Sequence, residues 1–503
     1  MPQEMTSTGH EPSGSGRRIG VRILGLIVIA ASAAHAAASP GEGAESFDSE
    51  PKWDAQNNRS TAVEPRSVRQ DFGPSRTRHA GGEAGELGGF ISPAAEPAYC
   101  ALRIPRKTFA DPLEASGRLA GNDRPFHVLL GFFNSRTLKE WRTPNTIALR
   151  LQGRGDVLFA YVEYATSRWR AGGDNPGGFA TLRDSATGRG TLRGFSSHGE
   201  PHKWKLRYDP DADGGAGRVT ATIDGETAVC RLDPGHKADG AEFDRFGLLN
   251  VLKSADGGGE LWIDDVNVLG QLETFAQDPS WDEVGNRRTY TTTGVRPRFD
   301  FGFSPTRYAG GKAAGELGGV VFRGDCREAH KLASYAARLE TLNLARPLHA
   351  SGKVALRRGV SDSTTLIGFF DSRDSCRTST SQATAVPTSF LGASIGGPSA
   401  EGFYFEPTAN LGGGACGSPS PRPPYILPDA TPHDWAIDYL PVAGASGPRG
   451  RLTVTLDGAS TSVEISESSP ARTAFDRFGI VTTWIDGNAQ EVYFDDLKFT
   501  DRP

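Results

Sequence analysis

Aromatic, carboxylate and amide side chains that could bind a sugar are concentrated between residues 141 and 169, namely Trp141, Asn145, Tyr161, Glu163, Tyr164 and Trp169. An aromatic ring offers an apolar face to sugar C–H groups, and carboxylates and amides exchange hydrogen bonds with hydroxyls. Tyr161 and Glu163 are two residues apart and would share one face of a strand. The second half carries a similar pair, Tyr404 and Glu406. We expect carbohydrate binding on this face. The alternative is that Tyr161 packs inward and Glu163 pairs with an arginine such as Arg150.

Two aspartates are candidate metal ligands. Asp264 and Asp495 lie in the matching stretches LWIDDV and VYFDDL. Period-two alternation groups each with apolar neighbours and predicts that it points into a core. A buried carboxylate needs partners. Backbone N–H groups with Arg245 or Arg477 would satisfy it, and so would a structural Ca²⁺. Apart from this possible calcium, we expect no cofactor.

The motifs of several enzyme classes are absent. A jelly-roll retaining glycosidase would carry two carboxylates on one strand face, as in E-x-D-x-x-E, and the chain has no such triplet. It also lacks Q-x-H, G-x-S-x-G, H-E-x-x-H and a P-loop. We therefore assign no catalytic residue and favour a non-catalytic protein, without deciding against an enzyme whose site is unrecognised.

The elements that must position these residues occur twice. Seven blocks recur in the same order, as 46–59 and 274–287, 71–89 and 300–319, 131–136 and 368–373, 202–208 and 433–439, 217–225 and 450–458, 243–247 and 475–479, and 261–266 and 492–497. This is the pattern of a duplicated domain. We expect copy one at 46–273 and copy two at 274–503, after a signal peptide at 1–38 and a linker at 39–45.

Each copy is predicted to consist of strands. VTATI and LTVTL alternate apolar and polar residues and are followed by Asp224-Gly225 and Asp457-Gly458, which are hairpin-turn signals. Residues 327–342 have helical spacing, but the matching stretch of copy one contains Pro97 and Pro105, so we predict strands in both. Short strands at regular spacing favour an all-β fold of two tandem antiparallel β-sandwiches.

The GFF strand, the W-x-x-x-Y strand, the T-x-D-G hairpin and the closing FDRFG…DD strand resemble concanavalin A-like, laminin G-type jelly-roll domains. The tandem arrangement resembles that of large secreted bacterial proteins. The resemblance implies a jelly-roll fold shared by lectins, carbohydrate-binding modules, glycoside hydrolases and polysaccharide lyases. The fold does not choose among these functions.

The N-terminus has the organisation of an export signal. Arg17, Arg18 and Arg22 precede an apolar run from 23 to 34 and the Ala34-His35-Ala36 site. The run is shorter than the roughly 20 residues that span a bilayer. We expect a secreted, periplasmic or cell-surface protein without a membrane span in its mature form. Among five cysteines, Cys376 and Cys416 are the pair that we favour for a disulfide, the alternative being five isolated thiols.

Charge and composition narrow the partner. The 55 basic and 60 acidic residues give a formal charge of −5, which disfavours nucleic acid as a partner held by bulk charge. The sequence therefore predicts a secreted, non-catalytic protein that binds a polysaccharide or another extracellular polymer. The alternatives are a glycan-cleaving enzyme with an unrecognised site, and a structural or adhesive envelope protein.

Overall fold

The computed structural model describes residues 41–59, 64–121, 126–138, 143–154, 157–173, 195–196, 200–323, 332–360, 362–375, 386–397, 402–411, 417–442, 450–465, 473–483 and 487–503. The predicted signal peptide, Trp141, Cys376 and Cys416 lie outside these residues. Within them, Cys100 and Cys230 are buried. No helix among the described residues has the length and apolar character needed to cross a bilayer.

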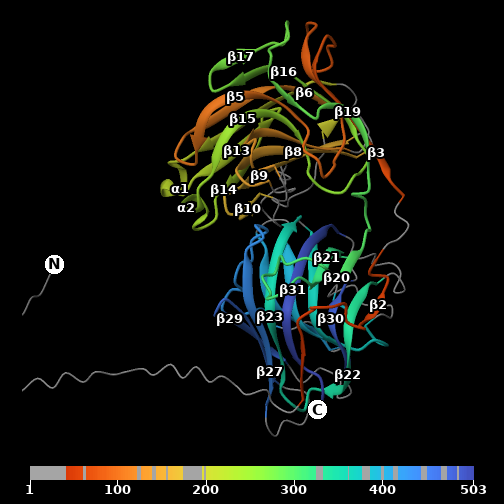
Figure 1. Ribbon diagram of the computed structural model, residues 1–503. Coiled ribbons are helices and arrows are strands. Elements are labelled where there is room, and N and C mark those ends of the chain that lie inside the picture. Colours follow the sequence, from red (N-terminus) through yellow and green to blue (C-terminus); the bar gives the residue numbers. More distant parts are fainter. Residues whose placement is uncertain are drawn as a thin grey trace, which may run out of the picture. The chain divides into compact units, whose positions relative to one another are not determined.

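The chain folds into two β-sandwiches, which confirms the predicted all-β class (Figure 1). The larger sheet of the first sandwich contains, in spatial order, β14 (Glu226–Arg231), β13 (Arg218–Ile223), β12 (His202–Asp209), β6 (Leu113–Gly121), β16 (Gly259–Val268), β4 (Glu86–Ile91), β3 (Arg66–Ser75) and β19 (Arg287–Thr292), with β17 (Gln271–Glu273) beside β16. Its smaller sheet contains β10 (Ala171–Gly172), β9 (Val157–Ala165), β8 (Thr146–Arg154), β7 (Phe126–Phe133), β15 (Glu242–Asn250), β5 (Tyr99–Thr108) and β18 (Asp282–Val284), with β11 (Phe195–Ser196) beside β9. Two short helices, α1 (Ala212–Gly215) and α2 (His236–Asp239), lie in its connections.

The second sandwich repeats this plan. Its larger sheet contains β20 (Asp300–Ser304), β21 (Glu316–Phe322), β31 (Ala489–Thr500), β23 (Leu348–Gly359), β27 (Pro432–Pro441), β28 (Gly450–Leu456) and β29 (Ala459–Ile465), with β1 (Glu42–Glu45) beside β31. Its smaller sheet contains β2 (Asp54–Gln56), β22 (Ser334–Asn343), β30 (Ala474–Val481), β24 (Ser363–Phe370), β25 (Phe390–Gly397) and β26 (Tyr404–Asn410). The pairings between these named strands are antiparallel, as in β7 with β8 and β24 with β25.

Local sequence explains several of these elements. In the β13–β14 hairpin Ile223 pairs with Glu226, and the two turn residues Asp224 and Gly225 both have positive φ, which a type I′ turn requires. Asp457 and Gly458 do the same between β28 and β29. The predicted strand at 327–342 is confirmed for its described part by β22. Each sandwich has its own core, built from inward-facing residues of both of its sheets.

The boundaries of the two sequence repeats differ from the boundaries of the two sandwiches. Residues 41–59 precede the first sandwich in sequence, yet β1 and β2 pair with β31 and β22 of the second. In Figure 1 the orange-red β2 accordingly lies beside the teal β22. The first sandwich instead ends with β17, β18 and β19, which continue past residue 273 to residue 292.

Candidate functional site

The predicted sugar-binding pair of copy one lies on the outer face of the smaller sheet. Strand alternation places Tyr161 and Glu163 of β9 on the same face, and the Tyr161 ring nevertheless belongs to the buried core cluster together with Ala160, Val162 and Tyr164. Both are buried: Tyr161 is 9% exposed and Glu163 is 3% exposed.

Arg150 on β8 explains how this pair is held. Arg150 lies opposite Tyr161 in the register, and its guanidinium is 4.3 Å from the centroid of the Tyr161 ring. The same guanidinium forms an ion pair with the Glu163 carboxylate. The alternative interpretation that Glu163 pairs with Arg150 is therefore confirmed. In the described conformation, the groups predicted to meet a sugar contact each other.

The other candidates of copy one have different surroundings. Asn145 has positive φ, and its side-chain carbonyl accepts the Glu242 N–H at 2.9 Å, so it joins a loop to β15. Tyr164 is a core residue whose hydroxyl accepts the Asp233 N–H at 2.9 Å. Trp169 is half-buried with positive φ. The structure thus groups Tyr161 and Glu163 but does not bring Tyr164 to their face.

The predicted equivalence of Tyr161–Glu163 with Tyr404–Glu406 is wrong. The repeated Gly131 and Gly368 pair with Ala148 and Gly392, which aligns β8 with β25. On β8 and β9 of copy one, Arg150 pairs with Tyr161 and Ala148 pairs with Glu163. On β25 and β26 of copy two, the corresponding pairs are Ser394 with Glu406 and Gly392 with Thr408. The two Y-x-E pairs are thus shifted by two residues. A shift of two preserves the face of the strand, and this is why the sequence pattern misleads.

In the second sandwich these positions therefore carry different chemistry. Where copy one has Arg150, Tyr161 and Glu163, copy two has Ser394, Glu406 and Thr408. The Thr408 hydroxyl donates to Ser394 Oγ at 2.9 Å, and the Ser394 hydroxyl donates to Glu406 Oε1 at 3.3 Å. Burial raises the pKa of the Glu406 carboxyl, and the hydrogen bond from Ser394 opposes that rise. Among the described residues, no ion pair is formed by Glu406.

Tyr404 and Tyr425 form a pair of rings beside Glu406. Residues 424–426 run antiparallel to β26, with the Phe405 N–H donating to the Pro424 carbonyl and the Ile426 N–H donating to the Phe403 carbonyl, both at 3.0 Å. This places the two tyrosines opposite each other, with ring centroids 4.6 Å apart and their hydroxyls 3.0 Å apart. Both rings are half-buried.

Arg422 and Gly396 complete this cluster. The exposed Arg422 guanidinium lies 5.3 Å from the Tyr404 ring and 5.6 Å from the Tyr425 ring, and it donates to the Tyr404 hydroxyl. Gly396 lies opposite Tyr404, and a Cβ there would approach Glu406 Oε1 to 2.9 Å. The glycine therefore leaves room for the carboxyl. We call Tyr404, Glu406, Arg422 and Tyr425 the tyrosine face.

Asp264 and Asp495 are buried, as predicted, but they do not point into the core. Each is followed by an aspartate with φ of +49°, and the strand register is irregular there. This β-bulge inserts an extra residue, so the side chains that follow it alternate in the opposite sense between the two faces of the sheet. Ile263 and Val266 therefore face the first core, whereas Trp262 and Asp264 face outward beneath a loop. In that loop His79 stacks on Trp262 with centroids 3.8 Å apart, and Gly81 lies against Asp264.

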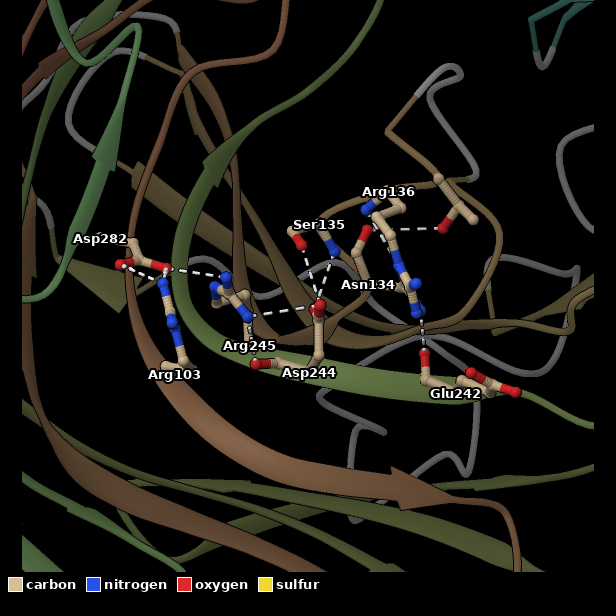
Figure 2. A network of polar contacts seen from close by, with 9 residues as sticks. Arg103, Asn134, Ser135, Arg136, Glu242, Asp244, Arg245 and Asp282 are labelled. Atoms are coloured by element: carbon tan, nitrogen blue, oxygen red, sulfur yellow. Dashed lines mark hydrogen bonds and ion pairs between the residues drawn. The ribbon is translucent and has the colours of Figure 1, made fainter.

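The arginines of FDRFG do not satisfy these aspartates, which corrects that prediction. Arg245 instead binds Asp282 at 2.8 Å and Asp244 at 3.3 Å, and both contacts are drawn in Figure 2. Asp244 also accepts the N–H and the hydroxyl of Ser135, both at 2.8 Å. Arg477 similarly binds Asp54 and Asp476. In the second sandwich Asp476 likewise accepts the N–H and the hydroxyl of Ser372, at 2.8 and 2.7 Å. The loops that follow the two GFF strands are therefore fixed to the FDRFG strands.

Asp495 has an unsatisfied oxygen. Its Oδ1 accepts the Asp496 N–H at 2.7 Å, but its buried Oδ2 has no hydrogen-bond partner among the described residues. Burial, followed by the negative charges of Asp496 and Glu316, raises the pKa of Asp495 to about 6. In copy one, Asp264 Oδ1 accepts the Asp265 N–H at 2.7 Å, and burial again raises the pKa of the carboxyl.

Carboxylate oxygens such as Asp495 Oδ2 are ligands that hard cations prefer. The described residues contain no group of three or more His, Cys, Asp and Glu side chains that could hold a metal.

Sequence reasoning missed the carboxylates that fix the loop above these aspartates. Glu86 is fully buried and accepts the N–H groups of His79 and Ala80, at 2.8 and 2.7 Å. Glu316 accepts those of Tyr308 and Ala309, at 2.9 and 2.8 Å. The signal was present, because the repeated stretch R-x-A-G-G precedes G-E-L-G-G in both copies.

Comparisons with known proteins show similarity in fold. No protein-family model matches the chain, and no curated protein matches it. Among solved structures, domains LG4-5 of the mouse laminin alpha1 chain are similar over 86% of this chain and 91% of that chain, with 12% identity and a TM-score of 0.20. The carbohydrate recognition domain of Emp47p matches 41% of this chain and 88% of that chain, with 12% identity and a TM-score of 0.24. The similarity is confined to the fold class, which the strand order already defines.

Proposed function

We propose that the protein is an exported, non-catalytic binder of a polysaccharide or a similar extracellular polymer, and that it binds through the tyrosine face. The observation that carries this proposal is the pair of half-buried rings 4.6 Å apart beside a carboxyl whose only described side-chain partner is a hydroxyl. The rings offer apolar faces to a sugar, and the carboxylate accepts from its hydroxyls. In copy one the position of Glu406 is occupied by Tyr161, whose ring lies against the Arg150 guanidinium of the Arg150–Glu163 pair, so binding there would require that pair to open.

Removing the Tyr404 ring should weaken glycan binding by roughly two- to twelvefold, since one stacked ring contributes about 0.5–1.5 kcal/mol. A glycan array on the mature protein would identify the ligand, and calorimetric titration of Tyr404→Ala, Glu406→Gln and Tyr425→Ala would then measure the loss. Tyr161→Ala in the first sandwich is the matched control and should bind as the wild type does. Loss of binding in Tyr161→Ala with full binding in Tyr404→Ala would contradict the assignment to the second sandwich.

The same titrations distinguish the alternatives. Cleavage products from a bound glycan would favour a glycan-cleaving enzyme. Absence of binding to every glycan by a protein that retains its fold would favour a structural or adhesive role.

Glycan affinity should rise with pH as Glu406 ionises. The carboxylate is a stronger acceptor than the neutral acid. Because burial raises the pKa of Glu406 above its ordinary 4.5, the rise should occur at higher pH than for an exposed glutamate. Titrations at several pH values would show this rise in the wild type and a flat profile in Glu406→Gln. A rise of equal size in Glu406→Gln would assign it to another group.

We further propose that Ca²⁺ binds at Asp495 and has a structural role. The unsatisfied Oδ2 and the raised pKa of this buried carboxyl support the proposal, because a cation would stabilise the ionised form that burial disfavours. Asp264 is the corresponding candidate in copy one.

A further inference from the structure

Residues 41–59, which we call the N-terminal closing segment, complete the second sandwich. β1 extends its larger sheet beside β31 and β2 extends its smaller sheet beside β22, so the segment crosses from one sheet to the other. Between the two strands, Phe47 is fully buried in the second core. Trp53 packs against Phe47, Tyr335 and Phe499, with centroids 5.2, 5.8 and 6.2 Å apart.

Polar contacts fix the register of this segment. Asp54 forms ion pairs with Arg338 and Arg477, both at 2.7 Å, and they lower the pKa of its carboxyl. Asn58 exchanges hydrogen bonds with the backbone of Phe301, and Arg59 binds Asp300 at 3.1 Å. Its described side-chain partners outside the segment itself thus belong to the second sandwich.

Residues 271–292, the middle closing segment, make the same contacts in the first sandwich. Phe275 and Trp281 are buried with centroids 5.2 Å apart, and Asp282 binds Arg103 and Arg245 at 3.1 and 2.8 Å (Figure 2). Asn286 exchanges hydrogen bonds with Phe72. Each sandwich is therefore completed by one closing segment, and we call the rest of the sandwich its body. In both bodies the segment contacts a pair of arginines and buried aromatic or aliphatic residues.

The two segments differ in how they reach their bodies. The middle closing segment follows directly from β16 of the body that it closes. The N-terminal closing segment is joined to its body only through residues 60–299, which include the whole first sandwich. The N-terminal closing segment therefore associates with a body that is distant in sequence. The strength of this association depends on the effective concentration of the segment at that body. The contacts would be identical if a second copy supplied residues 41–59.

We propose that the N-terminal closing segment is exchangeable, so that copies of the protein assemble when residues 41–59 of one copy close the second sandwich of another. The partner for this body is thus the segment of a second copy, recognised by Phe47 and Trp53 in the core, by Asp54 between two arginines and by the β1–β31 hydrogen bonds. The recipient's own segment is released by this exchange. It can close the donor, which gives a reciprocal dimer, or a third copy, which gives larger rings or open chains.

Disulfide trapping in the full-length protein tests this exchange. Ala44 and Lys498 are exposed and directly opposite each other in the β1–β31 ladder, where Cα atoms lie about 4.5–5.5 Å apart, within disulfide range. The donor copy carries Ala44→Cys. The recipient copy carries Lys498→Cys together with Phe47→Ala and Trp53→Ala, which weaken its own segment. The two are mixed, oxidised with diamide and separated by non-reducing electrophoresis with differently sized tags.

We expect a donor–recipient heterodimer at least about tenfold more abundant than with a recipient that carries Lys498→Cys alone. Adding Arg338→Glu and Arg477→Glu to the recipient should remove it, because both partners of Asp54 are then reversed. Unsubstituted protein treated identically gives the background from native cysteines.

Heterodimer yield that is unaffected by Phe47→Ala and Trp53→Ala, or by reversal of the two arginines, would overturn the proposal. If the recipient fails to fold, a labelled peptide of residues 41–59 and the Lys498→Cys protein provide a second test. The peptide carrying Ala44→Cys should form a saturable disulfide adduct, and the same peptide with Asp54→Arg should form at least tenfold less. Equal capture of both peptides would also overturn the proposal.

Discussion

Phe47→Ala should destabilise the second sandwich by about 3–5 kcal/mol and leave the first sandwich unchanged, although residue 47 precedes the first sandwich in the chain. The ring is fully buried in the second core and packs against Trp53, so its removal costs transfer free energy and leaves a cavity. Hydrogen exchange followed by mass spectrometry would locate the loss of protection in strands such as β22 and β31.

Phe275→Ala is the matched control for this prediction. It removes the corresponding ring from the first sandwich, where Phe275 is buried beside Trp281. Its loss of protection should therefore appear in β5 and β16. A Phe47→Ala protein that loses protection in the first sandwich instead would contradict the pairing of residues 41–59 with β31 and β22.

The repeat predicted the fold because its signals are local. Alternating residues with an Asp-Gly turn define a hairpin such as β13–β14 without reference to the rest of the chain. The GFF and FDRFG blocks became adjacent central strands in both sandwiches, β7 with β15 and β24 with β30. The closing segments could not be assigned from sequence, because both bodies offer an arginine pair and an apolar groove of the same kind.

The site was less predictable, since side-chain direction depends on single-residue irregularities. Strict period-two alternation placed Asp264 in the core, and the bulge at Asp265 turned it outward. The Y-x-E pattern in the sequence matched Tyr161 with Tyr404, whereas the strand pairing in the structure aligns Tyr161 with Glu406. Neither a bulge nor a two-residue shift changes the composition of a strand, so a single sequence carries little trace of either.

Asp495→Asn should stabilise the second sandwich at neutral pH by about 3 kcal/mol in the presence of a chelator. The folded-state pKa of Asp495 is raised from 3.8 to about 6, and one pKa unit corresponds to 1.36 kcal/mol. The protonated acid is favoured in the folded protein. Wild-type stability from this group should therefore be highest below pH 4, fall between about pH 4 and 6, and stay low above pH 6. The asparagine keeps the acceptor for the Asp496 N–H without the buried charge.

Calcium should reverse the sign of this effect. If Ca²⁺ binds the free oxygen of Asp495, its addition at pH 7 should raise the melting temperature of the wild-type second sandwich, and Asp495→Asn should not respond. Calorimetry with chelator and with Ca²⁺, at pH 4.5 and pH 7, gives both comparisons. Asp496→Asn is the control, because Asp496 is half-buried and asparagine tolerates its positive φ. Equal destabilisation by Asp495→Asn under all four conditions would mean that the carboxylate has a donor even without calcium, and both proposals for Asp495 would then be wrong.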